Sequence, residues 1–160
     1  MTDNLHYVTA WQRNDPKLEA DAIAMWTELG VLHPSIRPEQ RAKELVTLAY
    51  VGDRLVGITT AEVKHHKPVR QNIAFMRILM RPEFERQGIA VPFTIAMRET
   101  LREWSAANPA AQVAGCGIII TAKGYGRSPV TAAGLALAGY TDSGLQVRLY
   151  WWDHFRLPVA

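Results

Sequence analysis

One stretch of the sequence, residues 76–104, constrains the fold more than any other. Residues 76–80 indicate a strand, residues 81–90 form a polar segment that contains Gly88, and an apolar repeat follows from Val91 to Trp104. The stretch therefore predicts a strand, a tight turn and a long helix. The first N–H groups of a helix have no intrahelical partner, and they lie at the positive end of the helix dipole. Glycine and small residues let a ligand approach that backbone, so the turn is predicted to bind an anion such as phosphate.

The composition is that of a single globular domain. The chain has 160 residues, of which 48% are hydrophobic and 21% are charged, and this length is enough to bury a core. We expect one domain over residues 1–160, with residues 153–160 as a tail beyond the last strand. The 18 Lys and Arg residues exceed the 15 acids, but they are scattered along the sequence. This weakly basic balance suits a small anion, and it gives little support to nucleic-acid binding.

The single cysteine limits the chemistry of the chain. Cys116 has no second cysteine with which to form an intramolecular disulfide, and a thiolate zinc site is excluded. Because it precedes an apolar run, we expect a small buried residue rather than a nucleophile. We expect no metal, no membrane-spanning segment and no secretory signal, which together favour a cytoplasmic location.

The chain pattern predicts an α/β fold with a mixed, mostly antiparallel central sheet and helices on both faces. Asp15 and Pro16 are typical of a helix start, and Gly52 and Asp53 are typical of a hairpin turn. Residues 64–70 are predicted to form a basic loop, and residues 124–129 a glycine-rich turn. The predicted strands and helices are strands 5–10, 45–51, 54–63, 72–80, 117–121 and 146–152, and helices 16–29, 35–43, 91–107 and 130–138.

This order of elements, with an anion-binding turn after the fourth strand, resembles the GNAT superfamily of acyl-CoA-dependent N-acyltransferases. The family signature (Gln/Arg)-x-x-Gly-x-(Gly/Ala) aligns with residues 85–90, and its hydrophobic-x-Pro lead-in aligns with residues 80–82. A helix that ends in Gly-Phe in the family is matched by Gly139 and Tyr140. The similarity covers residues 5–152.

Three positions depart from the family pattern. Glu85 stands where the family usually has Arg or Gln, and its carboxylate would repel a pyrophosphate, although its backbone N–H can still donate if the side chain turns outward. Leu135 falls where many members have a tyrosine that protonates the leaving thiolate. The segment after Tyr140 is short, so the last two strands of the family are expected to be reduced to one or distorted.

The resemblance implies an acetyl-CoA-dependent N-acetyltransferase that moves an acyl group directly to a primary amine, with coenzyme A as the carrier and no metal. The acceptor is a small-molecule or protein amine. A distortion that separates strands 72–80 and 117–121 would admit the pantetheine arm. The residues implied to bind coenzyme A through their backbone are Leu79 and Met80 along pantetheine and Arg86, Gln87, Gly88, Ile89 and Ala90 around the pyrophosphate; Ser128 falls near a family asparagine.

Glu62 is the candidate base for the acceptor amine, because it lies at the end of a predicted strand beside the expected acceptor cleft. The alternative is a salt bridge from Glu62 to Arg77 across the hairpin. His65 and His66 titrate near neutral pH, but their position in a basic loop favours solvated side chains.

Arg77 has two interpretations. A charged guanidinium in the middle of a strand needs either a carboxylate partner or a water-filled cleft, because burying it alone is unfavourable. In a cleft, Arg77 would bind a carboxylate or phosphate of the acceptor; otherwise it pairs with Glu62 or Glu83 as a structural residue. Both interpretations stay open at this stage.

Tyr125 is the candidate for protonating the leaving thiolate, because Gly124 and Gly126 allow its turn to move, and Ser128 is the other polar candidate nearby. Tyr125 is equally consistent with a side chain that covers an apolar edge.

An aromatic cluster at the C-terminus, formed by Trp151, Trp152 and Phe155, is expected to be core or to pack on a partner subunit in a possible homodimer.

Two other functions remain open. The first is an acyl-CoA-binding sensor or scaffold without turnover on the same fold. The second is nucleic-acid binding through Lys64, Lys67 and Arg70, although these residues lack interleaved aromatics.

Overall fold

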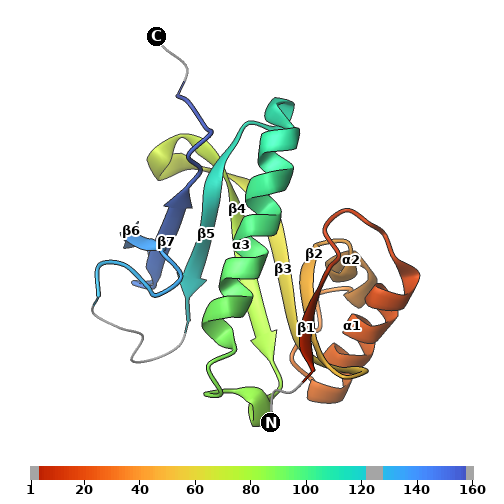
Figure 1. Ribbon diagram of the computed structural model, residues 1–160. Helices are drawn as coiled ribbons and strands as arrows, with labels where there is room; N and C mark the ends of the chain where they lie inside the picture. The colour runs from red at the N-terminus through yellow and green to blue at the C-terminus, as the bar shows by residue number, and fades with distance from the viewer. Residues whose placement is uncertain (1–3, 122–127, 158–160) are drawn as a thin grey trace. The chain divides into compact units, whose positions relative to one another are not determined.

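The computed structural model describes residues 4–121 and 128–157 (Figure 1). Three α-helices and seven strands make up the fold in that part of the chain, with three short 3-10 turns between them. In chain order the elements are β1 (Leu5–Thr9), α1 (Pro16–Leu29), α2 (Pro38–Ala42), β2 (Leu45–Val51), β3 (Arg54–His66), η1 (Lys67–Val69), β4 (Gln71–Met80), η2 (Pro82–Phe84), α3 (Ala90–Ala107), η3 (Pro109–Ala111), β5 (Val113–Ile120), β6 (Ala136–Tyr140) and β7 (Gln146–Trp151).

The strands form one sheet in the order β1-β2-β3-β4-β5-β7-β6. β4 and β5 are parallel, and the pairs β1–β2, β2–β3, β5–β7 and β6–β7 are antiparallel. The prediction of a mixed, mostly antiparallel sheet is confirmed. No helix within the described residues is both long and apolar enough to cross a membrane.

The chain divides into two compact units. Unit 1 comprises Met1–Ala61 and Arg77–Thr100, and unit 2 comprises Glu62–Met76 and Leu101–Ala160. The prediction of a single domain over residues 1–160 stays a prediction.

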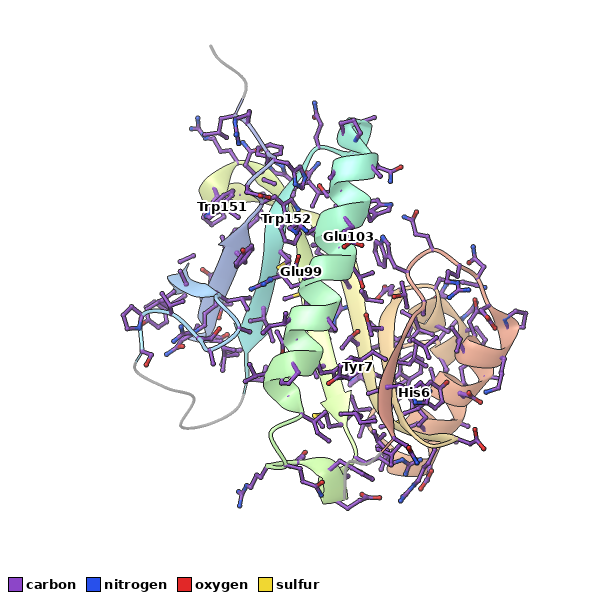
Figure 2. The ribbon with its side chains drawn as sticks, viewed as in Figure 1. His6, Tyr7, Glu99, Glu103, Trp151 and Trp152 are labelled. Atoms are coloured by element: carbon purple, nitrogen blue, oxygen red, sulfur yellow. The ribbon has the colours of Figure 1, made fainter. Side chains whose placement is uncertain are left out.

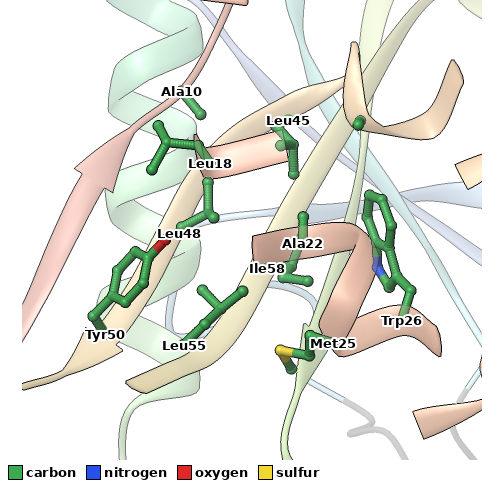
Figure 3. Close-up of a cluster of buried hydrophobic side chains, with 11 residues drawn as sticks. Ala10, Leu18, Ala22, Met25, Trp26, Leu45, Leu48, Tyr50, Leu55 and Ile58 are labelled. Atoms are coloured by element: carbon green, nitrogen blue, oxygen red, sulfur yellow. The ribbon is translucent and has the colours of Figure 1, made fainter. Parts of the chain in front are cut away.

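In unit 1, α1 packs on one face of β2 and β3. Asp15 caps the helix by accepting hydrogen bonds from the backbone N–H groups of residues 17 and 18, and Pro16 occupies the first helical position, as predicted. The helical repeat then places four apolar side chains inward against those of the two strands (Figure 3). The cluster contains Ala10, Leu18, Ala22, Met25, Trp26, Ala42, Leu45, Leu48, Tyr50, Leu55 and Ile58.

The first turns of α3 cover the other face of the same strands in unit 1. Phe93 is fully buried with Ala49 and Val56, and its ring stacks on Tyr7 with centroids 5.4 Å apart. His6, the neighbour of Tyr7 on β1, instead stacks on Tyr50 on the α1 side (Figure 2). Successive residues of a strand point to opposite faces, so β1 contributes to both layers. Helices therefore cover both faces of the sheet in unit 1, as predicted.

An ion pair between the buried Arg81 and the exposed Glu28 fastens α1 to the strands of unit 1. Arg81 has only 8% of its surface exposed, and its Nε donates to the carbonyl oxygen of Leu55 at 2.8 Å. Its Nη1 and Nη2 donate to the two carboxylate oxygens of Glu28 at 2.8 and 2.7 Å. This fork geometry satisfies the guanidinium on three sides, which a buried charge requires.

In unit 2, β5 and β7 pair closely because β5 carries small residues. A Cβ on Gly115 would lie 2.2 Å from the carbonyl oxygen of Tyr150, which excludes any side chain there. Cys116 is buried, as expected for a small core residue. The core of unit 2 includes Ile73, Ala114, Val147 and Leu149, with Val69, Phe75 and Phe155 packed against it.

The C-terminal aromatic residues do not form one cluster of equal burial. Trp152 is buried and stacks on His154, whereas Trp151 is 47% exposed, as expected for neighbours at the end of a strand (Figure 2). Phe155 packs against the core of unit 2. The prediction of a core role is confirmed for Trp152 and Phe155. Trp151 lies at the surface, and its packing on a partner subunit stays a prediction.

The predicted helix 130–138 is wrong. Residues 130–135 form a turn in which the backbone N–H of Thr131 donates to the carbonyl oxygen of Leu135, and the backbone N–H of Leu135 donates to Oγ1 of Thr131. Ala136–Tyr140 form β6. β6 pairs antiparallel with β7, so sheet formation overrides the helical tendency of the small residues. Gly139 and Tyr140 accordingly lie in a strand and do not end a helix. After Tyr140 the described part of the chain has one strand, β7, as predicted, and β6 occupies residues that were predicted to be helical.

Three element boundaries differ from the predictions by three or more residues, and one of them is the start of α2, which begins at Pro38 rather than at Ser35. β3 continues to His66, so the basic loop is shorter than expected and contains the 3-10 turn Lys67–Val69. β5 begins at Val113, four residues before the predicted start. Part of the predicted turn 124–129 lies outside the described residues.

The Arg81–Glu28 pair predicts a pH-dependent stability. Hydrogen bonds from Arg81 hold the pKa of Glu28 below its ordinary value of 4.5. A lowered carboxyl pKa contributes stability above pH 4.5, which is lost as the pH falls through the folded-state pKa. Glu28→Gln should therefore lower the urea midpoint at pH 7, and the difference from wild type should shrink at pH 3.

The control for this experiment is Glu103→Gln, which removes an exposed carboxylate from α3. It should leave the urea midpoint close to that of wild type at both pH values. An equal loss of stability for Glu28→Gln at pH 7 and pH 3 would contradict the role of this ion pair.

Candidate functional site

The turn between β4 and α3 presents a run of backbone N–H groups. Arg86 and Gly88 have φ angles of 63° and 75°, so two of three consecutive residues have left-handed φ values. In the part of the chain that the structure describes, no acceptor is recorded for the backbone N–H groups of residues 86–90. Alternating left-handed residues of this kind form concave groups of N–H donors that bind anions.

The side chains around this turn hold its backbone in place. Ile89 is buried beside Phe93, and the carbonyl oxygen of Ile89 accepts the first helical hydrogen bond of α3, from Phe93, at 3.0 Å. The side-chain Nε2 of Gln87 donates to the carbonyl oxygen of Glu83 at 2.7 Å. Residues 85–88 themselves are exposed. The turn therefore has a fixed base and an accessible outer surface.

The segment before the turn is tied to β3. Arg54 lies 2.5 Å from the carboxylate of Glu83, and its guanidinium lies 5.8 Å from the centre of the Phe84 ring. The backbone N–H of Glu85 donates to the carbonyl oxygen of Pro82 at 3.2 Å. The expectation that this N–H can donate to a ligand is therefore wrong, because the 3-10 turn already uses it.

A mostly apolar groove in unit 1 lies along β4. Its volume is about 340 Å³. Residues of β3 and β4 form one wall, and α1, α2 and the loop that joins these two helices supply the rest. The lining residues are Trp26, Val31, Leu32, Ile36, Arg41, Ile58, Thr60, Arg77, Ile78 and Leu79.

Arg77 lies in this groove and also forms an ion pair. Its Nη1 lies 3.0 Å from Oε2 of Glu44, and Nη1 of Arg41 lies 3.2 Å from the same oxygen. The two interpretations from the sequence are thus both met in part, because Arg77 is paired and lines a groove. Glu83, one of its predicted partners, pairs with Arg54 instead. The sequence reasoning missed Arg41 and Glu44, which are polar residues within the range predicted for a short helix and its end.

Glu62 and the two histidines lie on β3 rather than in a loop. The carboxylate of Glu62 lies 2.9 Å from Nζ of Lys64, two residues away on the same strand. Nδ1 of His65 lies 3.3 Å from the side-chain oxygen of Asn72, and the ring of His66 packs edge-on against Phe75. The role of Glu62 as a base stays a prediction.

The two candidates near the start of the predicted last helix have different outcomes. Tyr125 lies outside the described residues. Ser128 is exposed, and its carbonyl oxygen accepts a hydrogen bond from Nη2 of Arg148 at 2.8 Å. Arg148 is buried in β7, and its Nε donates to the side chain of Gln146. Arg148 therefore fastens residue 128 to the sheet of unit 2, a role that the sequence did not indicate.

A serine, a histidine and an aspartate also lie together in unit 2. Oγ of Ser105 lies 3.2 Å from Nε2 of His154, and Nδ1 of His154 lies 3.7 Å from Asp153. Ser105, however, is buried and donates its hydroxyl hydrogen to the carbonyl oxygen of Val113 at 3.0 Å. His154 must then donate to Ser105 rather than take its proton, which is the reverse of a hydrolase triad.

Comparison with known proteins relates this geometry to solved structures. No family profile and no curated protein matches the sequence. The acetyltransferase of the GNAT family from Streptococcus pneumoniae matches with a TM-score of 0.54 and 16% identity, over 91% of this chain and 96% of that chain. The protein yncA from Salmonella typhimurium, solved with its cofactor acetyl-CoA, matches with a TM-score of 0.58 and 12% identity over 99% of both chains.

A third match is N-acetylglutamate synthase from Neisseria gonorrhoeae, solved with coenzyme A and L-arginine. Its TM-score is 0.57 at 10% identity, and the match covers 94% of this chain and 34% of that chain. The chain has the GNAT fold. The resemblance stated from the sequence is confirmed at the level of the fold, and the GNAT fold is reached here with β6 in place of the predicted last helix.

Within this GNAT fold, His66 has an environment that titration can test. Burial against its neighbours and the nearby charge of His65 lower the pKa of His66 below 6.5. We expect the imidazole resonances of His66 to titrate in NMR with a midpoint below 6.5. The variant His66→Asn assigns the resonance, and a midpoint at or above 6.5 would contradict the packing of His66 on Phe75.

Proposed function

We propose that the chain is an acetyl-CoA-dependent N-acetyltransferase that transfers the acyl group directly to a primary amine. The observation that carries the proposal is the run of backbone N–H groups at residues 86–90 without a recorded acceptor among the described residues. It is supported by the GNAT fold, since two of the matching structures contain coenzyme A or acetyl-CoA.

The residues present fit the pyrophosphate of coenzyme A. The N–H groups of Arg86, Gln87, Gly88, Ile89 and Ala90 are the donors, and the positive end of the 18-residue helix α3 lies behind them. The exposed guanidinium of Arg86 adds positive charge beside them. Gly88 has open space where a Cβ would lie, so its role is the positive φ angle rather than room for a side chain.

The strand before the turn fits the pantetheine arm. We propose that the backbone N–H and C=O groups of Leu79 and Met80 form hydrogen bonds with this arm, as they would with an additional β-strand. The pairing of β4 with β5 supports this proposal. The two parallel strands pair at residues Asn72 to Phe75 of β4, whereas β4 itself continues to Met80. We propose Ser128 as a further contact of the cofactor.

Acetyl-CoA, when bound, supplies the acyl group as a thioester. The chain has to hold the amine close to that carbonyl and take up the proton that the amine loses. We propose Glu62 for the proton, directly or through a water molecule. We propose that Tyr125 gives a proton to the departing thiolate, and that Arg77 binds the acceptor.

A second candidate function is an acyl-CoA sensor without turnover. Two observations favour it: Glu85 places an exposed carboxylate next to the donors, and Leu135 is buried where many GNAT members have the tyrosine acid. Release of free thiol from acetyl-CoA across a panel of amines separates the two functions. Binding of acetyl-CoA without thiol release for any amine would support the sensor.

The variant Arg86→Gly separates cofactor binding from stability. Glycine adopts a φ of 63° without the cost that a larger residue pays, so the free energy of unfolding should not fall. The lost charge should weaken acetyl-CoA binding about 5- to 10-fold at low salt, as expected for one charged contact worth about 1 kcal/mol.

The matched control is Arg37→Gln, which removes one exposed positive charge from unit 1 away from the turn. Isothermal titration calorimetry with acetyl-CoA measures the affinity, and urea unfolding measures the stability. Equal affinities for wild type, Arg86→Gly and Arg37→Gln would contradict a pyrophosphate site at this turn.

A further inference from the structure

We infer that the groove along β4 binds the acceptor, and that the acceptor is a free α-amino acid with an apolar side chain. This inference rests on the proposed function. It names the chemical class of the amine from the lining of the groove, which combines apolar side chains with two arginines.

The position of the groove connects it to the proposed cofactor site. Leu79 lines the groove with its side chain, and its backbone belongs to the segment proposed to hold the pantetheine arm. A molecule in the groove therefore lies beside the strand along which the thioester would be held. All of the lining residues belong to unit 1.

The lining favours an apolar side chain on the acceptor. Seven of the lining residues are apolar or aromatic, and they come from both walls and from the loop between α1 and α2. Val31 of this loop is 49% exposed, and Leu32 and Ile36 are half-buried beside it. An apolar ligand would remove this surface from water, which is the main favourable term in binding of this kind.

The arginines favour a carboxylate on the same molecule. Arg41 and Arg77 both contact Oε2 of Glu44. The Nε of Arg41 is buried and has no hydrogen-bond partner in the described part of the chain, which is unfavourable for a charged group. A ligand carboxylate beside Arg41 would accept from the guanidinium in the planar fork geometry that suits this pair.

Glu44 does not exclude a ligand carboxylate from the groove. Its carboxylate is shared by two guanidinium groups, so its repulsion of a second carboxylate is weakened. A groove of about 340 Å³ lies at the small end of ligand sites, which suits a single amino acid. The N-terminal residue of a peptide has no carboxylate next to its amine, and a polyamine would meet two arginines.

The test compares acceptors that differ only in the carboxylate. We measure thiol release from acetyl-CoA with leucine, leucinamide, phenylalanine, phenylalaninamide and serine. For wild type, kcat/KM should be at least 10-fold higher for leucine than for leucinamide, and higher for leucine and phenylalanine than for serine.

Three variants locate this preference. Arg41→Gln should reduce the leucine-to-leucinamide ratio at least 10-fold, and Arg41→Lys should give an intermediate ratio, because it keeps the charge and loses the fork. Val31→Asp adds an acid at an exposed position and should raise KM for leucine more than for leucinamide. Arg37→Gln, with an exposed side chain outside the groove, should keep the wild-type ratio.

The outcomes separate the inference from the proposed function. Thiol release with amines but with a leucine-to-leucinamide ratio near one, or a ratio that Arg41→Gln leaves unchanged, overturns the inference alone. Absence of both acetyl-CoA binding and thiol release overturns the proposed function. Calorimetric titration of leucine and leucinamide into the protein with coenzyme A present tests the groove without turnover, and equal or undetectable binding of the two also overturns the inference.

Discussion

The backbone of the turn between β4 and α3 is the feature on which the functional account depends. The positive φ angles of Arg86 and Gly88 turn a run of N–H groups outward, and the burial of Ile89 with Phe93 fixes the start of α3 beneath them. Donors held in place before a ligand arrives lose little entropy when it binds. The same residues therefore complete a core on one side and leave, on the other, the exposed turn that we propose as the anion-binding surface.

Arginine–carboxylate pairs organise the rest of unit 1 around this turn. Arg81 joins Glu28 of α1 to the carbonyl oxygen of Leu55 on β3, and Arg54 holds the segment before the turn through Glu83. Arg41 and Arg77 share Glu44 beside the apolar groove. Arg54, Arg77 and Arg81 each connect segments that lie far apart in the sequence, so a few residues hold the elements of unit 1 together.

Much of the fold was predictable because local signals agreed with the final structure. The cap at Asp15, the hairpin at Gly52 and the strand–turn–helix of residues 76–104 each lie where the sequence placed them. The helix predicted for residues 130–138 failed because small residues have no strong preference of their own, and pairing with β7 decided their conformation. No pattern within residues 130–140 reveals that partner.

Only the part of the candidate site that consists of backbone groups could be predicted from the sequence. A glycine followed by the start of a helix identifies a turn such as residues 85–90. The proposed anion binding there depends on main-chain N–H donors, so this local pattern is enough to locate it. The ion pair of Arg77 with Glu44 and the hydrogen bond from Arg148 to the carbonyl oxygen of Ser128 join residues that are far apart in the sequence, so spacing along the chain does not show them. Arg77 was correctly singled out as a strand residue in need of a partner, but the partner, Glu44, comes from the turn between α2 and β2.

The most direct test of the account is an NMR titration of the backbone amides with coenzyme A. The account predicts that the largest shifts fall on the amides of Arg86, Gln87, Gly88, Ile89 and Ala90, and that inorganic phosphate shifts the same amides at higher concentration. Shifts that spare these five amides, or no shifts at millimolar coenzyme A, would contradict the central claim.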